Sequence, residues 1–154
     1  MKDKIKLILG TMTFGSRIDL EGSKELVKKL IDDGYNELDT AYSYNEGKTE
    51  EILGRVLSEI NNDSIKIATK INPRITGKLD REAVEMQLSK SLERLKRDYV
   101  DIMYFHFPDP YTPIEDALET SAKLYDQGKF KKLGLSNFPS CQVVDIWHLC
   151  DKKG

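Results

Sequence analysis

Short apolar runs recur along the chain at nearly even intervals. They are "IKLIL" from Ile5, "NELD" from Asn36, "IKIATK" from Ile65, "VDIMYFH" from Val100 and "KKLGLSN" from Lys131, with starts 31, 29, 35 and 31 residues apart. Between these runs, apolar residues recur with helical spacing, as at Leu26, Val27, Leu30 and Ile31. A regular alternation of strands and helices predicts a parallel sheet covered by helices.

Capping signals place the ends of two of the expected helices. Ser23 is a suitable N-cap for the first helix, and Gly34 is expected to end it. The segment "TPIE" at 112–115 combines a cap at Thr112, a proline in the first turn and a glutamate three residues after the cap. Gly128 is expected to end that helix before the fifth strand.

The polar residues at the ends of the strands distinguish a barrel from an open doubly wound sheet. The first turn, "GTMTFG", lacks the GxGxxG spacing that an open nucleotide-binding sheet carries after its first strand. The later strands instead end in Asp39, Lys70, His106 and the pair Ser136 and Asn137. A barrel places functional residues at the C-terminal tips of several strands, so this distribution favours a barrel.

Composition narrows the class of protein. The length of 154 residues suits one domain. The chain has 24 Lys and Arg against 26 Asp and Glu, which gives a net charge of −2, and it has no basic cluster. We therefore expect no nucleic-acid partner. No apolar run approaches membrane-spanning length, and the first residues lack the features of a signal peptide. The spacing of Cys141 and Cys150 fits neither a metal nor a redox motif. We therefore expect a cytoplasmic protein without a membrane partner.

Each residue at a strand tip has a simple explanation when it is taken alone. Asp39 could form a turn, Tyr44 could pack in a loop, Lys70 could be a solvated strand end, and His106 could be a hydrogen-bonded core histidine. The nearby Tyr42 is expected to pack. Parallel neighbouring strands, however, bring all their C-terminal tips to one face, so the four residues together predict a site.

An acid, a phenol, an ammonium and an imidazole form a plausible proton-transfer set. A tyrosine, with a reference pKa of about 10, needs a neighbouring cation to favour its phenolate near neutral pH. Lys70 can supply that charge, and Asp39 can hold the lysine. His106 can orient a substrate carbonyl or share the proton with Tyr44. Such a set protonates the oxyanion formed when a hydride adds to a carbonyl, and the hydride implies a nicotinamide cofactor.

A second chemistry could use the same residues. A lysine at a barrel strand tip can form a Schiff base with a carbonyl substrate, which would make the chain an aldolase-type lyase. Trapping of substrate on Lys70 by borohydride would support that alternative.

Several motifs resemble those of one family. "LGTMTFG", "GYNELDTAYSY", "ATK", "YFHFPD" and "GLSN" occur in the order and spacing of the aldo-keto reductases, and "EGKTEEILG" and "PSCQVVDIWHLCDKKG" are similar to the aflatoxin-aldehyde or succinic-semialdehyde reductase branch. The resemblance covers essentially the whole chain. It implies the α/β fold of a (β/α)8 TIM barrel, of which residues 1–154 would be the N-terminal part of the single domain, with about five βα units.

The resemblance also implies roles for individual residues. Tyr44 would be the general acid, Lys70 the cation beside it, Asp39 the partner of that lysine and a border of the cofactor site, and His106 the residue that orients the substrate. For cofactor binding, it implies that the nicotinamide carboxamide is bound by Ser136 and Asn137 and that the first loop borders the nicotinamide through Met12 and Thr13. The implied reaction is reduction of an aldehyde or ketone to an alcohol by NADPH, without a metal.

The chain is shorter than the barrel it resembles, which typically needs about 250 residues. We therefore expect the chain alone to bind NADPH weakly, to turn over little carbonyl substrate and to self-associate through exposed strand edges. The alternative function is that of a non-catalytic, regulatory protein that associates with a full-length reductase or with a channel-type partner, as some relatives of this barrel do.

Overall fold

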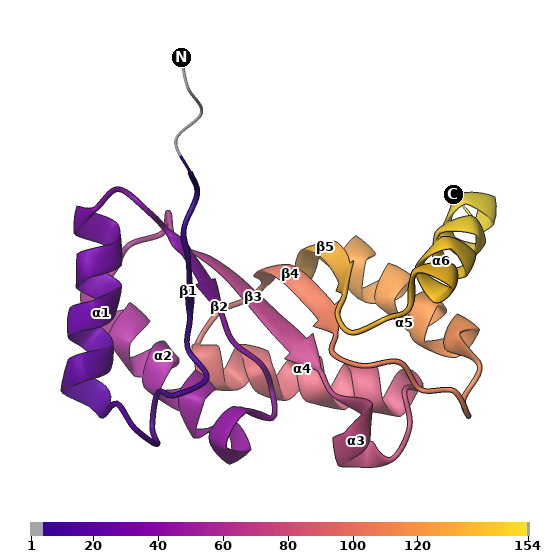
Figure 1. Ribbon diagram of the computed structural model, residues 1–154, viewed down its shortest axis with the longest axis horizontal. Coiled ribbons are helices and arrows are strands. Elements are labelled where there is room, and N and C mark those ends of the chain that lie inside the picture. Colours follow the sequence, from indigo (N-terminus) through magenta and orange to yellow (C-terminus); the bar gives the residue numbers. More distant parts are fainter. Residues whose placement is uncertain (1–4, 154) are drawn as a thin grey trace.

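The computed structural model describes residues 5–153, which form five βα units in chain order (Figure 1). Residues 1–4 and 154 of the expected domain lie outside the described part. The strands are β1 (Ile8–Gly10), β2 (Glu37–Asp39), β3 (Lys66–Ile71), β4 (Val100–Phe105) and β5 (Phe130–Leu135). The helices are α1 (Leu20–Asp32), α2 (Lys48–Ile60), α3 (Pro73–Thr76), α4 (Arg81–Leu95), α5 (Ile114–Asp126) and α6 (Ser140–Lys153), with the short 3-10 helix η1 (Tyr44–Gly47) before α2.

The strands form one parallel sheet in the order β1-β2-β3-β4-β5. Each strand thus lies beside its neighbour in the sequence, as in a (β/α)8 barrel, and the chain has the fold of such a barrel over five of its units. In the register of the sheet, Gly10 pairs with Asp39, and Lys70 pairs with Tyr104. All the C-terminal strand ends therefore lie along one edge, and the polar tip residues are carried there together.

Two of the expected helix starts are wrong. Helix α1 begins at Leu20 and is capped by Asp19, whose Oδ1 accepts the Gly22 amide at 2.9 Å. Ser23 lies one turn inside the helix, where its hydroxyl donates to the Asp19 carbonyl at 2.6 Å. The helix starts one turn earlier than expected because the carboxylate of Asp19 already satisfies a free amide of its first turn.

Thr112 does not cap α5, because Pro113 occupies the N-cap position and the helix begins at Ile114. The Thr112 hydroxyl hydrogen-bonds to Asp109 instead. The expected ends of the two helices agree better with the structure, since Gly34 and Gly128 follow the last helical residues with φ values of 83° and 71°. The first strand is shorter than "IKLIL", because only Ile8–Gly10 pairs with β2.

The hydrophobic core lies between the sheet and the helices on one side of it (Figure 1). Along β3, Ile67, Thr69 and Ile71 are buried on the helix side, as the alternation of side chains along a strand requires. Helices α2 and α4 bring Leu53 and Leu88 onto this face, and each is at most 1% exposed. Burial of one such side chain contributes about 1.5–3 kcal/mol. This layer holds the strands and therefore the positions of their tips.

The opposite face of the sheet carries no helix in the described part of the chain (Figure 1). Ile8 is 58% exposed there. At the N-terminal end of the strands, the Lys66 ammonium lies 3.7 Å from the Glu37 carboxylate. Closer to the tips, the ring of Tyr104 packs directly over Gly134. Among the described residues, β1 and β5 each pair with one strand only, so both edges present unpaired backbone groups.

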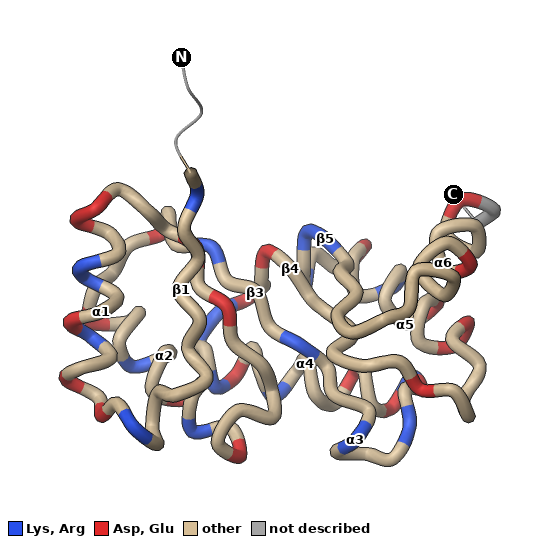
Figure 2. Tube along the Cα trace, in the orientation of Figure 1, with Lys and Arg blue, Asp and Glu red and all other residues tan. Residues whose placement is uncertain are grey.

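Acidic and basic residues are intermixed along the chain (Figure 2). This mixture agrees with the near balance of 24 basic and 26 acidic residues. Over residues 5–153, no helix has both the length and the apolar character that spanning a membrane requires.

Candidate functional site

Lys70 lies at the centre of a cluster at the C-terminal edge of the sheet. It is the fifth residue of β3, and it is only 7% exposed. Its Nζ lies 2.5 Å from Asp39 Oδ2 and donates to the Thr40 carbonyl at 2.7 Å. A buried ammonium is costly unless it is paired. The last residue of β2 and the carbonyl that follows it provide this pairing.

Tyr44 lies beside the same ammonium. Its hydroxyl oxygen is 3.4 Å from Lys70 Nζ, and its ring centroid is 5.1 Å from that nitrogen. The tyrosine is the first residue of η1, in the loop that leaves β2, and its amide donates to the Ala41 carbonyl at 3.1 Å. The loop therefore turns back over the sheet edge, and one cation contacts both a carboxylate and a phenol.

The loop around Tyr44 is shaped by a residue that the sequence analysis did not select. Asn45 has a left-handed backbone, with φ 48° and ψ 43°. Its Nδ2 donates to the carbonyls of Met12 and Phe14 at 2.8 and 2.9 Å and to the Thr49 hydroxyl at 3.0 Å. Asn45 thus joins the first loop to the loop of Tyr44. The sequence did carry a signal for this role, namely an asparagine directly before "EG". Asparagine adopts left-handed backbone conformations more readily than most residues.

His106 follows β4 and faces Tyr44. The two ring centroids are 6.0 Å apart in an edge-to-face arrangement, and His106 also stacks on Phe107. Its buried Nδ1 has no hydrogen-bond partner among the residues that the structure describes. Burial lowers the pKa of His106 below its usual 6.5, and the positive charges of Lys70 and Arg74 lower it further, against the opposing effect of Asp39. The imidazole is therefore neutral at neutral pH.

We expect the NMR titration of the His106 ring to have a midpoint below 6.5. Between that midpoint and 6.5 the unfolded chain binds more protons than the folded one, so the contribution of His106 to stability is complete above 6.5 and declines as the pH falls. The chain has two histidines, so loss of one signal in His106→Asn assigns the resonance. A midpoint at or above 6.5 would contradict the burial argument.

The remaining predicted residues surround this cluster. Asn137, with φ 62°, donates from Nδ2 to the His106 carbonyl at 2.8 Å and to the Ser136 hydroxyl at 3.0 Å, which joins the tips of β4 and β5. Met12 is 61% exposed, and its carbonyl accepts a hydrogen bond from the Asn45 side chain. Thr13 builds the turn of the first loop, because its carbonyl accepts the amides of Arg17 and Ile18.

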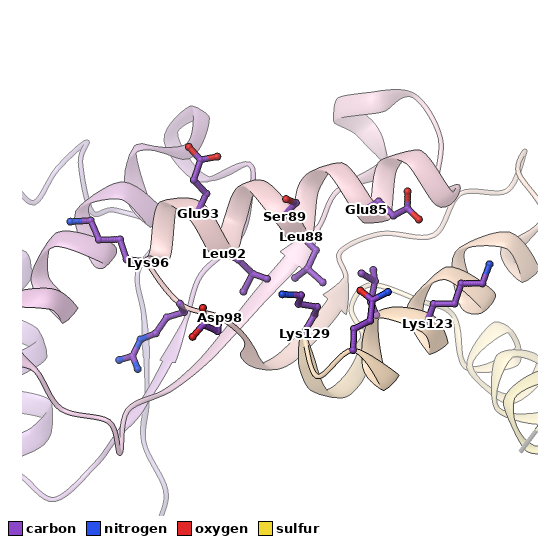
Figure 3. A pocket seen from close by; sticks show the side chains of 12 residues that line it. Glu85, Leu88, Ser89, Leu92, Glu93, Lys96, Asp98, Lys123 and Lys129 are labelled. Carbon is purple, nitrogen blue, oxygen red and sulfur yellow. The ribbon is translucent and has the colours of Figure 1, made fainter.

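Several grooves on the surface do not include the residues of this cluster. One of about 570 Å³ lies between α4 and α5, with Leu88 and Leu92 between charged side chains that include Glu85, Lys123 and Lys129 (Figure 3). It borders the helices rather than the strand tips, so it offers no route to Lys70 or Tyr44.

Comparison with known proteins relates the chain to one protein family. The model of the aldo/keto reductase family matches residues 6–153. A human protein named aflatoxin B1 aldehyde reductase member 2 is 40% identical over 153 residues, which cover 98% of this chain and 43% of that protein. An Arabidopsis thaliana protein named as a probable voltage-gated potassium channel subunit beta is 33% identical over 148 residues, 92% of this chain and 45% of that protein.

A solved structure has the same fold. A thermostable aldo-keto reductase, crystallised with the inhibitor epalrestat, superposes with a TM-score of 0.78 and 32% identity over 90% of this chain and 52% of its own. The chain spans less than half the length of the curated relatives described above. The family model nevertheless matches nearly every residue of the chain, which therefore belongs to the aldo/keto reductase family.

Proposed function

We propose that the chain reduces aldehydes or ketones to alcohols with NADPH and that Tyr44 is the general acid. The observation that carries the proposal is the position of Lys70, whose ammonium contacts both the Asp39 carboxylate and the Tyr44 hydroxyl. An ammonium beside a phenol favours the phenolate, so the hydroxyl can give its proton to a developing alkoxide. The Asp39 carboxylate keeps the ammonium in place beside the Tyr44 hydroxyl.

The residues at the strand tips suit a nicotinamide cofactor. The Ser136 hydroxyl and the Asn137 amide provide a donor and an acceptor of the kind that a carboxamide requires. His106 has a buried ring nitrogen without a partner among the described residues, and its neutral ring can donate to a carbonyl oxygen. Bound NADPH would supply the hydride, and the residues described here would orient the carbonyl and protonate its oxygen.

The same contacts argue against a Schiff base on Lys70. Schiff-base formation requires the neutral amine. The carboxylate of Asp39 and the carbonyl of Thr40 both stabilise the charged ammonium. The arrangement therefore favours proton transfer over covalent catalysis.

Incubation of the purified chain with NADPH and a panel of aldehydes tests the proposal. We expect slow oxidation of NADPH that depends on the aldehyde, with the alcohol as the product identified by mass spectrometry. NADH in place of NADPH measures the cofactor preference. A chain that is folded by circular dichroism, yet forms no alcohol with any aldehyde, would exclude the proposed activity.

A regulatory role is the second candidate. It rests on the likeness to a protein named as a channel subunit and on the unpaired edges of β1 and β5, which can pair with another chain. Co-expression with a tagged full-length reductase distinguishes the two functions. Co-purification of a chain that forms no alcohol would favour the regulatory role, whereas alcohol formation by the isolated chain would favour catalysis.

A further inference from the structure

An arginine on α4 reaches the loop that carries Tyr44. The Arg94 Nη1 donates to the Tyr42 carbonyl at 3.1 Å, across 52 positions of the sequence. The guanidinium carbon lies 4.6 Å from the centroid of the Tyr42 ring. The planar cation therefore contacts both the backbone and the side chain of the residue two positions before Tyr44.

The same guanidinium also covers the far end of that loop. A Cβ placed on Gly47 would lie 2.2 Å from Arg94 Cζ and 2.4 Å from Nη2. Gly47 has a φ of 94°, a conformation that favours glycine, and a Cβ there would displace the guanidinium from this position. Arg94 thus contacts the loop on both sides of Tyr44, at Tyr42 and at Gly47.

A buried carboxylate holds Arg94 in this place. Glu50 on α2 has a fully buried side chain, and its Oε2 lies 3.3 Å from Arg94 Nη1. Its Oε1 accepts the Thr69 hydroxyl at 2.7 Å. Burial raises the pKa of Glu50, whereas the hydroxyls of Thr69 and Ser91 and the charge of Arg94 oppose that rise. Replacement of either partner would leave the other charge buried and unpaired.

This network connects two members of the candidate site. Thr69 immediately precedes Lys70 in β3, and its side chain points to the helices while that of Lys70 points to the sheet edge. The chain of contacts therefore runs from β3 through Glu50 and Arg94 to the loop of Tyr44. The Tyr44 hydroxyl and Lys70 Nζ lie 3.4 Å apart, and the segments that carry these two groups are both held by this network.

We propose that Arg94, held by Glu50, is a positioning residue that sets the distance between the Tyr44 hydroxyl and the Lys70 ammonium. The catalytic consequence rests on the function proposed above, whereas the ordering of the loop does not. A misplacement of about 1 Å at a reacting group can cost roughly 100-fold in rate. A loop held less firmly should therefore affect turnover more than substrate binding.

The variant Arg94→Gln tests the proposal, with Arg97→Gln as the matched control. Arg97 lies just beyond the end of α4 and is one of the residues that line the groove between α4 and α5. We expect Arg94→Gln to lower kcat roughly 10- to 100-fold with little change in the KM of the aldehyde. We also expect hydrogen exchange at the Tyr44 and Lys48 amides, which are bonded within the loop, to accelerate roughly tenfold more than exchange at the His106 amide, which is bonded to β3. Arg97→Gln should change none of these.

The two readouts distinguish the possible failures. Unchanged exchange in the loop of Arg94→Gln overturns the proposal, as does an unchanged kcat when the natural chain is active. Loss of the buried partner of Glu50 destabilises the whole fold, so the proposal depends on the difference between amides. An equal acceleration at the Tyr44, Lys48 and His106 amides would indicate a general structural role and would also overturn it. If the natural chain forms no alcohol, the proposed function fails, and exchange at Tyr44 and Lys48 still decides whether Arg94 positions the loop. If Arg94→Gln does not fold, Arg94→Lys takes its place in both measurements, because lysine keeps a cation beside Glu50.

Discussion

Replacement of Tyr44 by phenylalanine is expected to lower alcohol formation by roughly 100- to 10,000-fold, the usual contribution of a general acid. The substitution removes the hydroxyl that lies 3.4 Å from Lys70 Nζ and leaves the ring beside His106. The ion pair of Lys70 and Asp39 does not depend on that hydroxyl, so the fold should persist. The measurement is the initial rate of NADPH oxidation at saturating aldehyde, with NADPH affinity from a fluorescence titration.

Tyr42→Phe is the matched control. This tyrosine precedes Tyr44 by two residues, and its hydroxyl contacts the sulfur of Met86 at 3.6 Å rather than the Lys70 ammonium. We expect its removal to leave the rate nearly unchanged, because the ring that packs on Arg94 remains. Equal losses of rate in the two variants would indicate that the loop, and not the phenol of Tyr44, limits turnover. Full activity in Tyr44→Phe would exclude that residue as the acid.

Gly54→Ala is expected to lower the free energy of unfolding by about 2 kcal/mol, although alanine is the better helix former by about 1 kcal/mol. Gly54 lies on α2, and a Cβ there would be 2.0 Å from the carbonyl oxygen of Arg94 and 3.1 Å from the carbonyl carbon of Leu95. These are backbone atoms at the end of α4, so they cannot move aside as a side-chain tip can. The two helices would have to separate, which loosens the buried layer between them. Urea denaturation followed by circular dichroism measures the change.

The control for Gly54→Ala is a second helical glycine. In α1, a Cβ on Gly22 would lie 3.1 Å from Ile18 Cγ2 and 3.3 Å from Asp19 Oδ1, both of which are side-chain atoms. Small adjustments of these side chains suffice, so we expect Gly22→Ala to change the unfolding free energy by less than about 1 kcal/mol. If Gly54→Ala were as stable as the natural chain, α2 and α4 would be packed more loosely than the structure indicates.

The unit structure of the fold could be predicted because its signals are local. Apolar runs about 30 residues apart, with helical periodicity between them, indicated the five strands and the helices that connect them. Parallel strands in chain order carry their C-terminal ends to one edge by topology alone. For that reason Asp39, Lys70 and His106 could be selected as neighbours from their positions at the strand ends.

The helix starts were less predictable, because several residues compete for one cap. Asp19 and Ser23 both have side chains that can accept an amide, and in the fold Asp19 takes the N-cap position with an extended backbone. Similarly, Thr112 could cap α5 by its residue type, yet Asp109 engages its hydroxyl. Local composition limits such choices to a few residues, and tertiary contacts select among them.

The chemical identities at the strand tips were thus determined by the sequence itself, since they follow from which residues end the apolar runs. Only the tertiary structure decided how the loop of Tyr44 is held. Asn45 bridges that loop to Met12, and Arg94 contacts Tyr42 from a helix that begins after the following strand. The contact of Arg94 depends on how closely α2 and α4 pack, which is set by the summed burial of many side chains and leaves no periodic mark in the sequence.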